Sequence, residues 1–281
     1  MSMFDPITMQ DVGNTVLDQI KGFDEKIQSL NSVLSFGLND SNYSNFYNVA
    51  SGISLAIGGV CLAIAVISAY IAIVKEGLTL KGDWKKIVTI LLRLAITKGL
   101  IDSSTQFITW IYSFPAKITN IIINYTSNKG SGGVLTSIFN PEDIAKGLGV
   151  VEDSGQISKF VALQYARFIG FAFFVLSIII FIIALARILK IYTLLAVASV
   201  AFSKIPLYGI DGCKDYIKEM FALGLQGGII SASVCFFEVA NTSISSICGG
   251  GVFGSLGSVF VVAISMILLI SKSEEIARKV A

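Results

Sequence analysis

Long apolar runs separated by short polar segments make up most of this chain. A helix that crosses a bilayer needs about 20 mostly apolar residues. Four uncharged runs approach or reach this length, and they cover 53–74, 168–186, 220–237 and 252–270. A fifth run, 87–114, contains Arg93, Lys98 and Asp102 but is otherwise apolar enough to count as a span. The pattern therefore predicts an all-α, polytopic membrane protein.

The apolar segment 191–203 is too short to cross a bilayer comfortably, and it directly follows Arg187 and Lys190. Basic residues in short loops mark the cytoplasmic side, and the loop 75–86 contains four lysines. This rule places the N-terminus outside and the end of the third span inside. We therefore predict five spans plus one re-entrant or interfacial helix over 191–203, with the C-terminus in the cytoplasm. Six spans are the alternative.

Three regions follow from this pattern. Residues 1–45 are predicted to form an extracytoplasmic amphipathic helical leader that Thr8 and Asp11 start as a capping pair. Residues 46–271 form a transmembrane domain with an external loop over 115–159, and residues 272–281 form a cytoplasmic amphipathic tail.

Apolar residues recur along the leader every three or four positions, as they do in a coiled coil. They are Val16, Ile20, Phe23, Ile27, Leu30 and Leu34. A single helix cannot bury such a narrow stripe by itself. The stripe therefore packs on the bilayer or on the chain's own membrane domain, or it docks onto another subunit or copy.

The composition excludes most catalytic chemistry. Charged residues make up 14% of the chain, whereas soluble domains carry about 25%. The absence of histidine removes the usual general bases, the Ser–His and Cys–His nucleophiles and the common zinc sites. The sequence also lacks a P-loop and the HExxH and GxGD motifs of intramembrane proteases. We predict that the protein is not an enzyme and has no catalytic residue, no metal and no cofactor.

Two sets of residues inside the apolar runs are candidates for function. Lys98, Asp102, Gln106 and Thr109 share one helix face near the middle of the second span, where buried charge is costly. This polar stripe is either a satisfied pair that holds a helix bundle together, or the lining of a wet passage or a contact with another subunit.

The second set consists of small residues, which allow membrane helices to approach closely. These residues are Gly224, Gly228, Ser231, Gly250, Gly254 and Ser258. They predict tight helix packing, either within one chain or between copies of it.

Three stretches resemble a known family. They are LLRLAITKGLI at 91–101, which leads to Trp110; RILKIY at 187–192, with small apolar residues after it; and 212–231, with YIK and LGLQGG. In these stretches the chain is similar to the TrbL-like polytopic inner-membrane channel subunits of type IV secretion and conjugation systems, in their Gram-positive form. The resemblance covers about residues 50–281, and the motifs are diffuse.

The resemblance implies a non-enzymatic scaffold and channel component of a DNA-transfer machine in the cell membrane of a bacterium, with a Gram-positive source expected. Its partners would be membrane lipid, copies of itself, other type IV secretion subunits that include separate ATPases, and relaxase-bound single-stranded DNA, contacted indirectly. The net charge of +2 suits a membrane platform better than a surface that grips DNA directly. The alternative is a secondary transporter or small-solute carrier.

Overall fold

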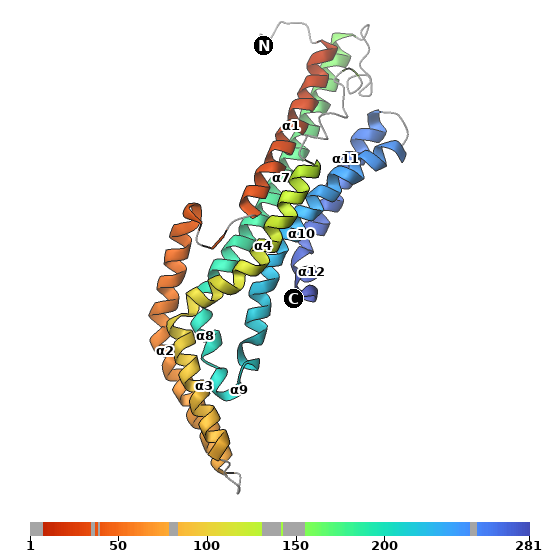
Figure 1. The fold of residues 1–281 in the computed structure, drawn as a ribbon. Coiled ribbons are helices and arrows are strands. Elements are labelled where there is room, and N and C mark those ends of the chain that lie inside the picture. Colours follow the sequence, from red (N-terminus) through yellow and green to blue (C-terminus); the bar gives the residue numbers. More distant parts are fainter. Residues whose placement is uncertain are drawn as a thin grey trace. The chain divides into compact units, whose positions relative to one another are not determined.

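A computed structural model of the chain describes residues 8–34, 37–38, 40–78, 84–130, 142, 155–247 and 252–281. Every regular element in these ranges is helical, which confirms the predicted all-α class (Figure 1). The elements are α1 (Met9–Leu34), η1 (Ser41–Tyr43), α2 (Ser44–Leu78), α3 (Trp84–Asp102), α4 (Ser104–Gly130), α7 (Gln156–Ala196), α8 (Ala198–Phe202), α9 (Ile205–Tyr208), α10 (Asp211–Ile247), α11 (Val252–Ser271) and α12 (Ser273–Val280).

Among the described residues, three helices are long and apolar enough to cross a membrane, at Ser41–Gly77, Gln156–Ala196 and Asp211–Phe236. They contain the predicted runs 53–74 and 168–186 and nearly all of 220–237. At about 1.5 Å per residue, the 41 residues of α7 extend for roughly 60 Å, about twice the thickness of the hydrocarbon core. Helix α7 therefore extends well beyond a single predicted span. Helix α11 coincides with the last predicted run and has 20 residues.

The chain divides into two compact units, which we treat separately. Unit 1 comprises Met1–Ser35, Thr119–Leu185 and Gly227–Ser273. Unit 2 comprises Phe36–Ile118, Ala186–Gln226 and Glu274–Ala281.

The leader is a helix of unit 1, and it begins with the predicted capping pair. The Thr8 amide donates to the Asp11 carboxylate at 2.8 Å, and the Asp11 amide donates to the Thr8 hydroxyl at 3.2 Å. Hydrogen bonds from the Thr8 hydroxyl and amide also lower the pKa of Asp11. Two orphan N–H groups at the helix start are satisfied in this way.

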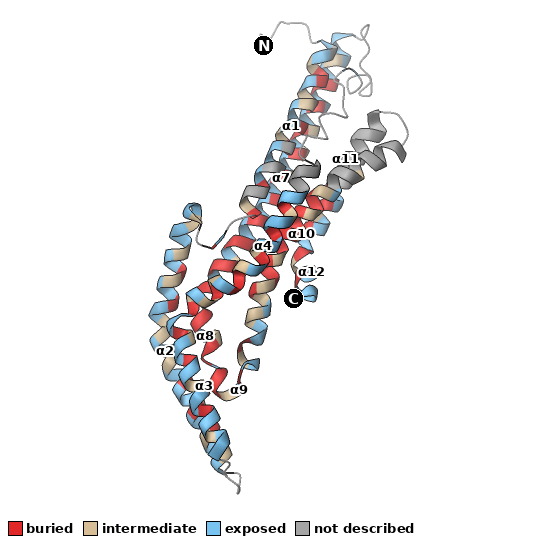
Figure 2. Cartoon of the chain, in the orientation of Figure 1, coloured by how far each residue is buried: buried red, intermediate tan, exposed pale blue. Residues whose placement is uncertain are grey.

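The apolar stripe of the leader is buried within its own chain. The buried members are Val16, Ile20, Phe23, Leu30 and Leu34, and each is at most 2% exposed. They pack against residues of α7 such as Ala166 and Phe173, and buried positions recur along α1 in Figure 2. The stripe therefore packs within its own chain in the structure, which favours this predicted alternative over docking onto another subunit. The side chain of Ile27 lies outside the described residues.

Helices α1 and α7 run parallel in a constant register. An added Cβ at Gly170 would lie 2.5 Å from the Gln19 side chain, the rings of Phe23 and Phe173 are 5.3 Å apart, and the Lys26 ammonium lies 4.4 Å from the Phe174 ring. Glycine at 170 thus makes room for Gln19, and the aromatic pair fixes the register one turn further on.

Unit 2 is built on an antiparallel hairpin of α2 and α3. Ala69 and Ala72 on α2 pack with Ile90 on α3, and Leu207 on α9 covers this cluster. Helices α8 and α9 follow the end of α7 and lie beside α2 and α3. The chain then reverses at Gly209, whose φ of 66° suits glycine, and continues into α10.

Two predicted boundaries differ from the structure. The segment 191–203 is not a separate helix, because α7 continues to Ala196 and α8 begins after Val197. Arg187 and Lys190 lie inside α7 and not at its end, and both have partners inside unit 2.

The second difference lies at Pro115, where the predicted span ends near residue 114 and the external loop begins. Helix α4 instead passes through this residue to Gly130. An interior proline costs roughly 3 kcal/mol through a lost hydrogen bond and a steric clash. Here its buried ring lies against Gly224, and this packing offsets part of the cost. Most of the remaining predicted loop lies outside the described residues.

Replacing Phe23 by alanine should loosen α1 from α7. Loss of a buried phenylalanine costs roughly 3 kcal/mol, so the opened form of the leader becomes far more populated. We expect trypsin to cleave the variant after the exposed Lys21 and Lys26 much faster than it cleaves the wild type. Asn14→Ala on the exposed face of α1 is the control, and equal cleavage rates in all three proteins would contradict the observed packing.

Candidate functional site

A buried arginine connects three helices of unit 2. The side chain of Arg187 on α7 is 3% exposed. Its Nε donates to the Leu223 carbonyl at 2.9 Å, and one terminal nitrogen donates to the Tyr112 hydroxyl at 3.2 Å and to the Gly224 carbonyl at 3.4 Å. The guanidinium is planar and presents several donors, so one side chain can join α4, α7 and α10 at a single point.

Gly224 makes this junction possible. A Cβ at this position would overlap the Pro115 ring and would lie 3.5 Å from the Tyr112 ring. Without a side chain, the α10 backbone approaches α4 closely enough for its carbonyls to reach Arg187. Gly228, one turn further along α10, lies in the same way against Thr119 and Ile122 within unit 1.

Three buried hydroxyls join another set of helices in unit 2. Ser54 on α2 lies 3.1 Å from Ser104 on α4 and 2.9 Å from Ser199 on α8, and Ser104 and Ser199 are 3.1 Å apart. The Ser199 hydroxyl also lies 3.1 Å from the Ser54 backbone carbonyl, to which it can donate instead. Small polar side chains of this kind allow close approach and bond across helices in membrane proteins.

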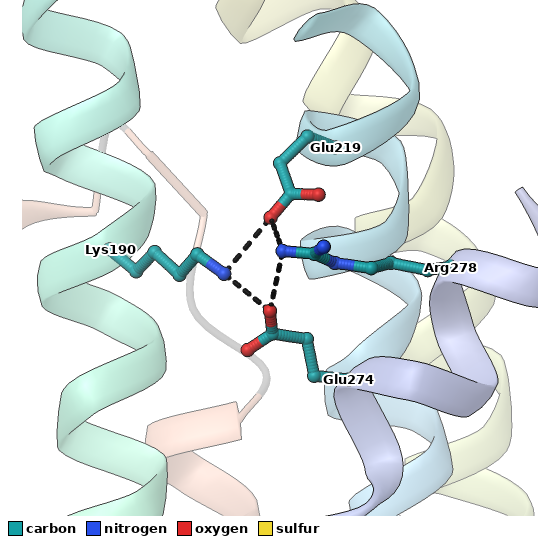
Figure 3. Close-up of polar contacts among 4 residues, drawn as sticks. All are labelled: Lys190, Glu219, Glu274 and Arg278. Atoms are coloured by element: carbon teal, nitrogen blue, oxygen red, sulfur yellow. Dashed lines mark hydrogen bonds and ion pairs between the residues drawn. The ribbon is translucent and has the colours of Figure 1, made fainter. Parts of the chain in front are cut away.

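A closed ring of four charges joins α7, α10 and α12 (Figure 3). Glu219 lies 2.9 Å from Lys190 and 2.7 Å from Arg278. Glu274 binds the same two cations, with Arg278 at 2.8 Å. Each carboxylate has two cations and each cation has two carboxylates, so the ring is neutral. It fixes the C-terminal helix against the two longer helices.

The charges of the ring also act on the titration of Glu274. The hydrogen bond from the Lys190 ammonium lowers the pKa of Glu274 below its ordinary value of 4.5, and the charges of Lys190 and Arg278 lower it further. Partial burial acts in the opposite direction but does not reverse the shift. Glu274 is therefore ionised at neutral pH.

The predicted polar stripe lies on α3 and α4, which meet at Ser103. Lys98, Asp102 and Gln106 are exposed, and Thr109 is half-buried and donates to the Thr105 carbonyl at 2.7 Å. Of the ion pairs among the described residues, none includes Lys98 or Asp102. Three of the four stripe residues therefore lie on the outside of unit 2.

The predicted small-residue set separates into two parts. Gly224, Gly228 and Ser231 are buried in the chain, and the two glycines pack against α4 of the same chain. Gly250 and the side-chain surroundings of Gly254 and Ser258 lie outside the described residues. Close packing within the chain thus accounts for the two glycines on α10.

Reasoning from the sequence misses the roles of Arg187, Lys190 and Glu219. The two basic residues indicate a membrane boundary under the positive-inside rule, and nothing local identifies their partners. One signal was available, because Glu219 directly precedes the uncharged run 220–237, where a carboxylate needs a cation nearby.

The arrangement is suited to holding helices together. In the part of the chain that the structure covers, no group of three His, Cys, Asp or Glu side chains could hold a metal. Comparisons of the chain with family models, with curated proteins and with solved structures find no match.

Gly224→Ala should destabilise the protein more than Gly228→Ala. The new methyl group at 224 meets a proline ring that cannot rotate away, which costs roughly 1–3 kcal/mol. At 228 it meets the mobile end of Ile122 at 2.8 Å, so the substitution is close to neutral. Thermal unfolding in detergent measures both effects, with Gly59→Ala as the control because an added Cβ there contacts nothing. The reverse order of stabilities would refute the observed packing.

Acid should weaken the ring of four charges. A carboxylate with a lowered pKa stabilises the fold above its unfolded value, and this contribution is lost as the pH falls through the folded value. We expect the melting temperature of the wild type to drop between pH 5 and pH 3, as the Glu274 contribution, at most about 1 kcal/mol for a partly exposed pair, is lost. In Glu274→Gln the melting temperature should fall less over this pH range, because the Glu274 contribution is already absent. Glu275→Gln, which changes an exposed pair with Lys279, should show the same fall as the wild type.

Proposed function

We propose that this chain is an integral membrane scaffold and channel subunit of a type IV secretion machine, which supports the transfer of relaxase-bound single-stranded DNA. The observation that carries the proposal is the placement of charge in unit 2. Arg187 and the ring of Lys190, Glu219, Glu274 and Arg278 use their charges to hold helices of the chain together. Such groups build a rigid membrane platform and perform no chemistry on a substrate.

The exposed part of the polar stripe supports assembly with other subunits. Lys98 and Asp102 lie in the predicted second span, where charges facing lipid are costly. Because neither has an ion-pair partner in the described part of the chain, a neighbouring subunit or a water-filled passage would satisfy both of them. A homo-oligomer and other secretion subunits, with separate ATPases, are the partners that we propose for this face.

The low net charge also supports an indirect role toward the DNA. The net charge is +2, and a chain that grips a nucleic-acid backbone needs a concentrated basic surface. The proposed role is therefore to shape and support the passage, with the substrate bound elsewhere in the machine. Its place is the cell membrane of a Gram-positive bacterium, with the N-terminus outside and the C-terminus in the cytoplasm.

Five spans remain the topology that we propose. The tip of the α8–α9 segment lies beside the end of α2, where Tyr208, Lys75 and Lys86 line one pocket. This position supports a location of α9 on the same side as the lysine-rich loop 75–86. Five spans plus a re-entrant segment meet this condition, whereas the six-span alternative puts Lys204 and its neighbours on the opposite side.

Cysteine labelling tests this topology. In a background without native cysteines, Tyr208→Cys and Lys75→Cys should both react with a membrane-impermeant maleimide only after the cells are permeabilised. Both positions are exposed, so burial does not prevent labelling. Labelling of position 208 in intact cells would favour six spans.

Asp102→Asn tests the functional proposal in a mating assay. Removal of the exposed charge should lower the transfer frequency at least about ten-fold, as expected for the loss of a charged contact worth about 1.5–3 kcal/mol. The amount of protein in the membrane should stay unchanged. Asp215→Asn, at another exposed acid of unit 2, is the matched control.

Deletion of the gene sets the baseline of that assay. Normal transfer without the protein would refute the proposal. If the purified chain alone moved a small solute into liposomes, the protein would be a secondary transporter and not a secretion subunit.

A further inference from the structure

A basic pocket lies between α2, α3 and α9 in unit 2. Its volume is about 430 Å³, within the range of roughly 300–1,000 Å³ that is usual for small-ligand sites. Its lining residues are Ala72, Lys75, Glu76, Lys86, Thr89, Ile90, Arg93, Pro206, Leu207 and Tyr208. The three helices contact one another in pairs, so the walls of the pocket are fixed by the fold.

Positive charge is in excess in this pocket. Among the described residues of the pocket lining, Lys75, Lys86 and Arg93 face one carboxylate, Glu76, which binds Lys86 at 3.1 Å. Among the described residues, no ion pair includes Lys75 or Arg93. Two cations are therefore available for an anion that enters the pocket.

Arg93 lies beside the turn after α9. Its guanidinium carbon lies 3.5 Å from the point that a Cβ would occupy at Gly209, and its two terminal nitrogens lie 3.7 Å from the same point. The guanidinium thus lies in van der Waals range of the turn at Gly209. A planar group of this kind can bind two oxygens of a phosphate at once.

The surroundings place the pocket at the edge of the bilayer. Lys75 follows directly on the apolar run 53–74, and α2 is one of the helices long and apolar enough to cross a membrane. Trp84 and Tyr208 are 71% and 62% exposed at this end of the unit. Exposed tryptophan and tyrosine are enriched at membrane interfaces, where the headgroups lie.

Helix α2 also carries exposed apolar side chains in the two turns before Lys75. Ile67, Ile71 and Val74 are exposed on the last turns of α2 before Lys75. A ligand with a phosphate at Lys75 and Arg93 and with hydrocarbon chains along this helix would satisfy both the charges and the apolar side chains. A free phosphate would satisfy only the charges.

We propose that this pocket binds the phosphate headgroup of an anionic phospholipid, with Lys75 and Arg93 as the binding cations. Lys86 supports the site from the rim, because Glu76 already neutralises part of its charge. Basic pockets between membrane helices recognise lipid headgroups by the same combination of charge and depth. The site is independent of DNA transfer and goes beyond the proposed function.

Fluorescence quenching by brominated lipid tests the proposal in the full chain. The protein has two tryptophans, so Trp110→Phe leaves Trp84, two residues before Lys86, as the only reporter. The variant is reconstituted in phosphatidylcholine vesicles that contain increasing fractions of brominated phosphatidylglycerol. Brominated phosphatidylcholine with the same chains is the parallel series. We expect phosphatidylglycerol to quench Trp84 at a several-fold lower fraction than phosphatidylcholine.

Substitutions in this background identify the binding cations. Arg93→Gln and Lys75→Gln should each reduce the preference for phosphatidylglycerol about five-fold, in line with the strength of one cation near an anionic membrane surface. Lys204→Gln is the matched control, because Lys204 is an exposed cation at the start of α9 that does not line the pocket. Size-exclusion profiles show whether each variant is folded. If Arg93→Gln misfolds, Lys75→Gln still tests the site.

Three outcomes would overturn the proposal. They are equal quenching by the two lipids in the unsubstituted pocket, an equal loss of preference in Lys204→Gln, and complete displacement of phosphatidylglycerol by inorganic phosphate at constant ionic strength. The second would indicate a general surface-charge effect, and the third would assign the pocket to a free anion. None of these results depends on the mating assay.

Discussion

The buried guanidinium of Arg187 is the constraint on which unit 2 depends. A charge in this position is tolerated only when its donors are satisfied, and the carbonyls of Leu223 and Gly224 and the Tyr112 hydroxyl meet that need together. These groups come from two helices, α10 and α4, and the arginine itself lies on a third, α7. Helices α4, α7 and α10 must therefore cross at this level, because any other arrangement would leave a buried charge without its partners.

The other polar groups of unit 2 extend this arrangement. Gly224 brings the α10 backbone to the junction and receives the ring of Pro115, so one glycine allows both the charge and a proline inside a helix. The serine cluster joins α2, α4 and α8, and the ring of four charges attaches α12. Hydrophobic attraction between helices is weak in lipid, so specific polar contacts of this kind carry much of the selectivity.

The sequence is sufficient for the fold class and for the faces of several helices. Apolar run length predicts the long helices, the three-and-four spacing from Val16 to Leu34 predicts a stripe that needs burial, and the small residues of α10 predict close packing. Each of these signals is local, because it depends on residues a few positions apart. The partner of each face is not local, and so the stripe of α1 could be assigned to α7 only in the structure.

The same limit explains the errors at Pro115 and around Arg187. A proline after an apolar run favours a helix end, and basic residues after such a run favour a membrane boundary. Both rules are statistical, and here both are overridden by contacts with residues more than 30 positions away, at Gly224 and Leu223. For the polar stripe, helical spacing predicts that its residues share one helix face. Whether that face is exposed depends on how the helices of unit 2 pack, which the spacing does not reveal.

The parallel pairing of α1 with α7 has a consequence for biosynthesis. Phe23 and its ring partner Phe173 are separated by 150 positions in the sequence. At a synthesis rate of about 5–20 residues per second, the leader waits roughly 8 to 30 s before α7 has been made. Its apolar face is uncovered during that interval, so a chaperone, the insertion machinery or the bilayer surface must shield it until its permanent neighbour arrives.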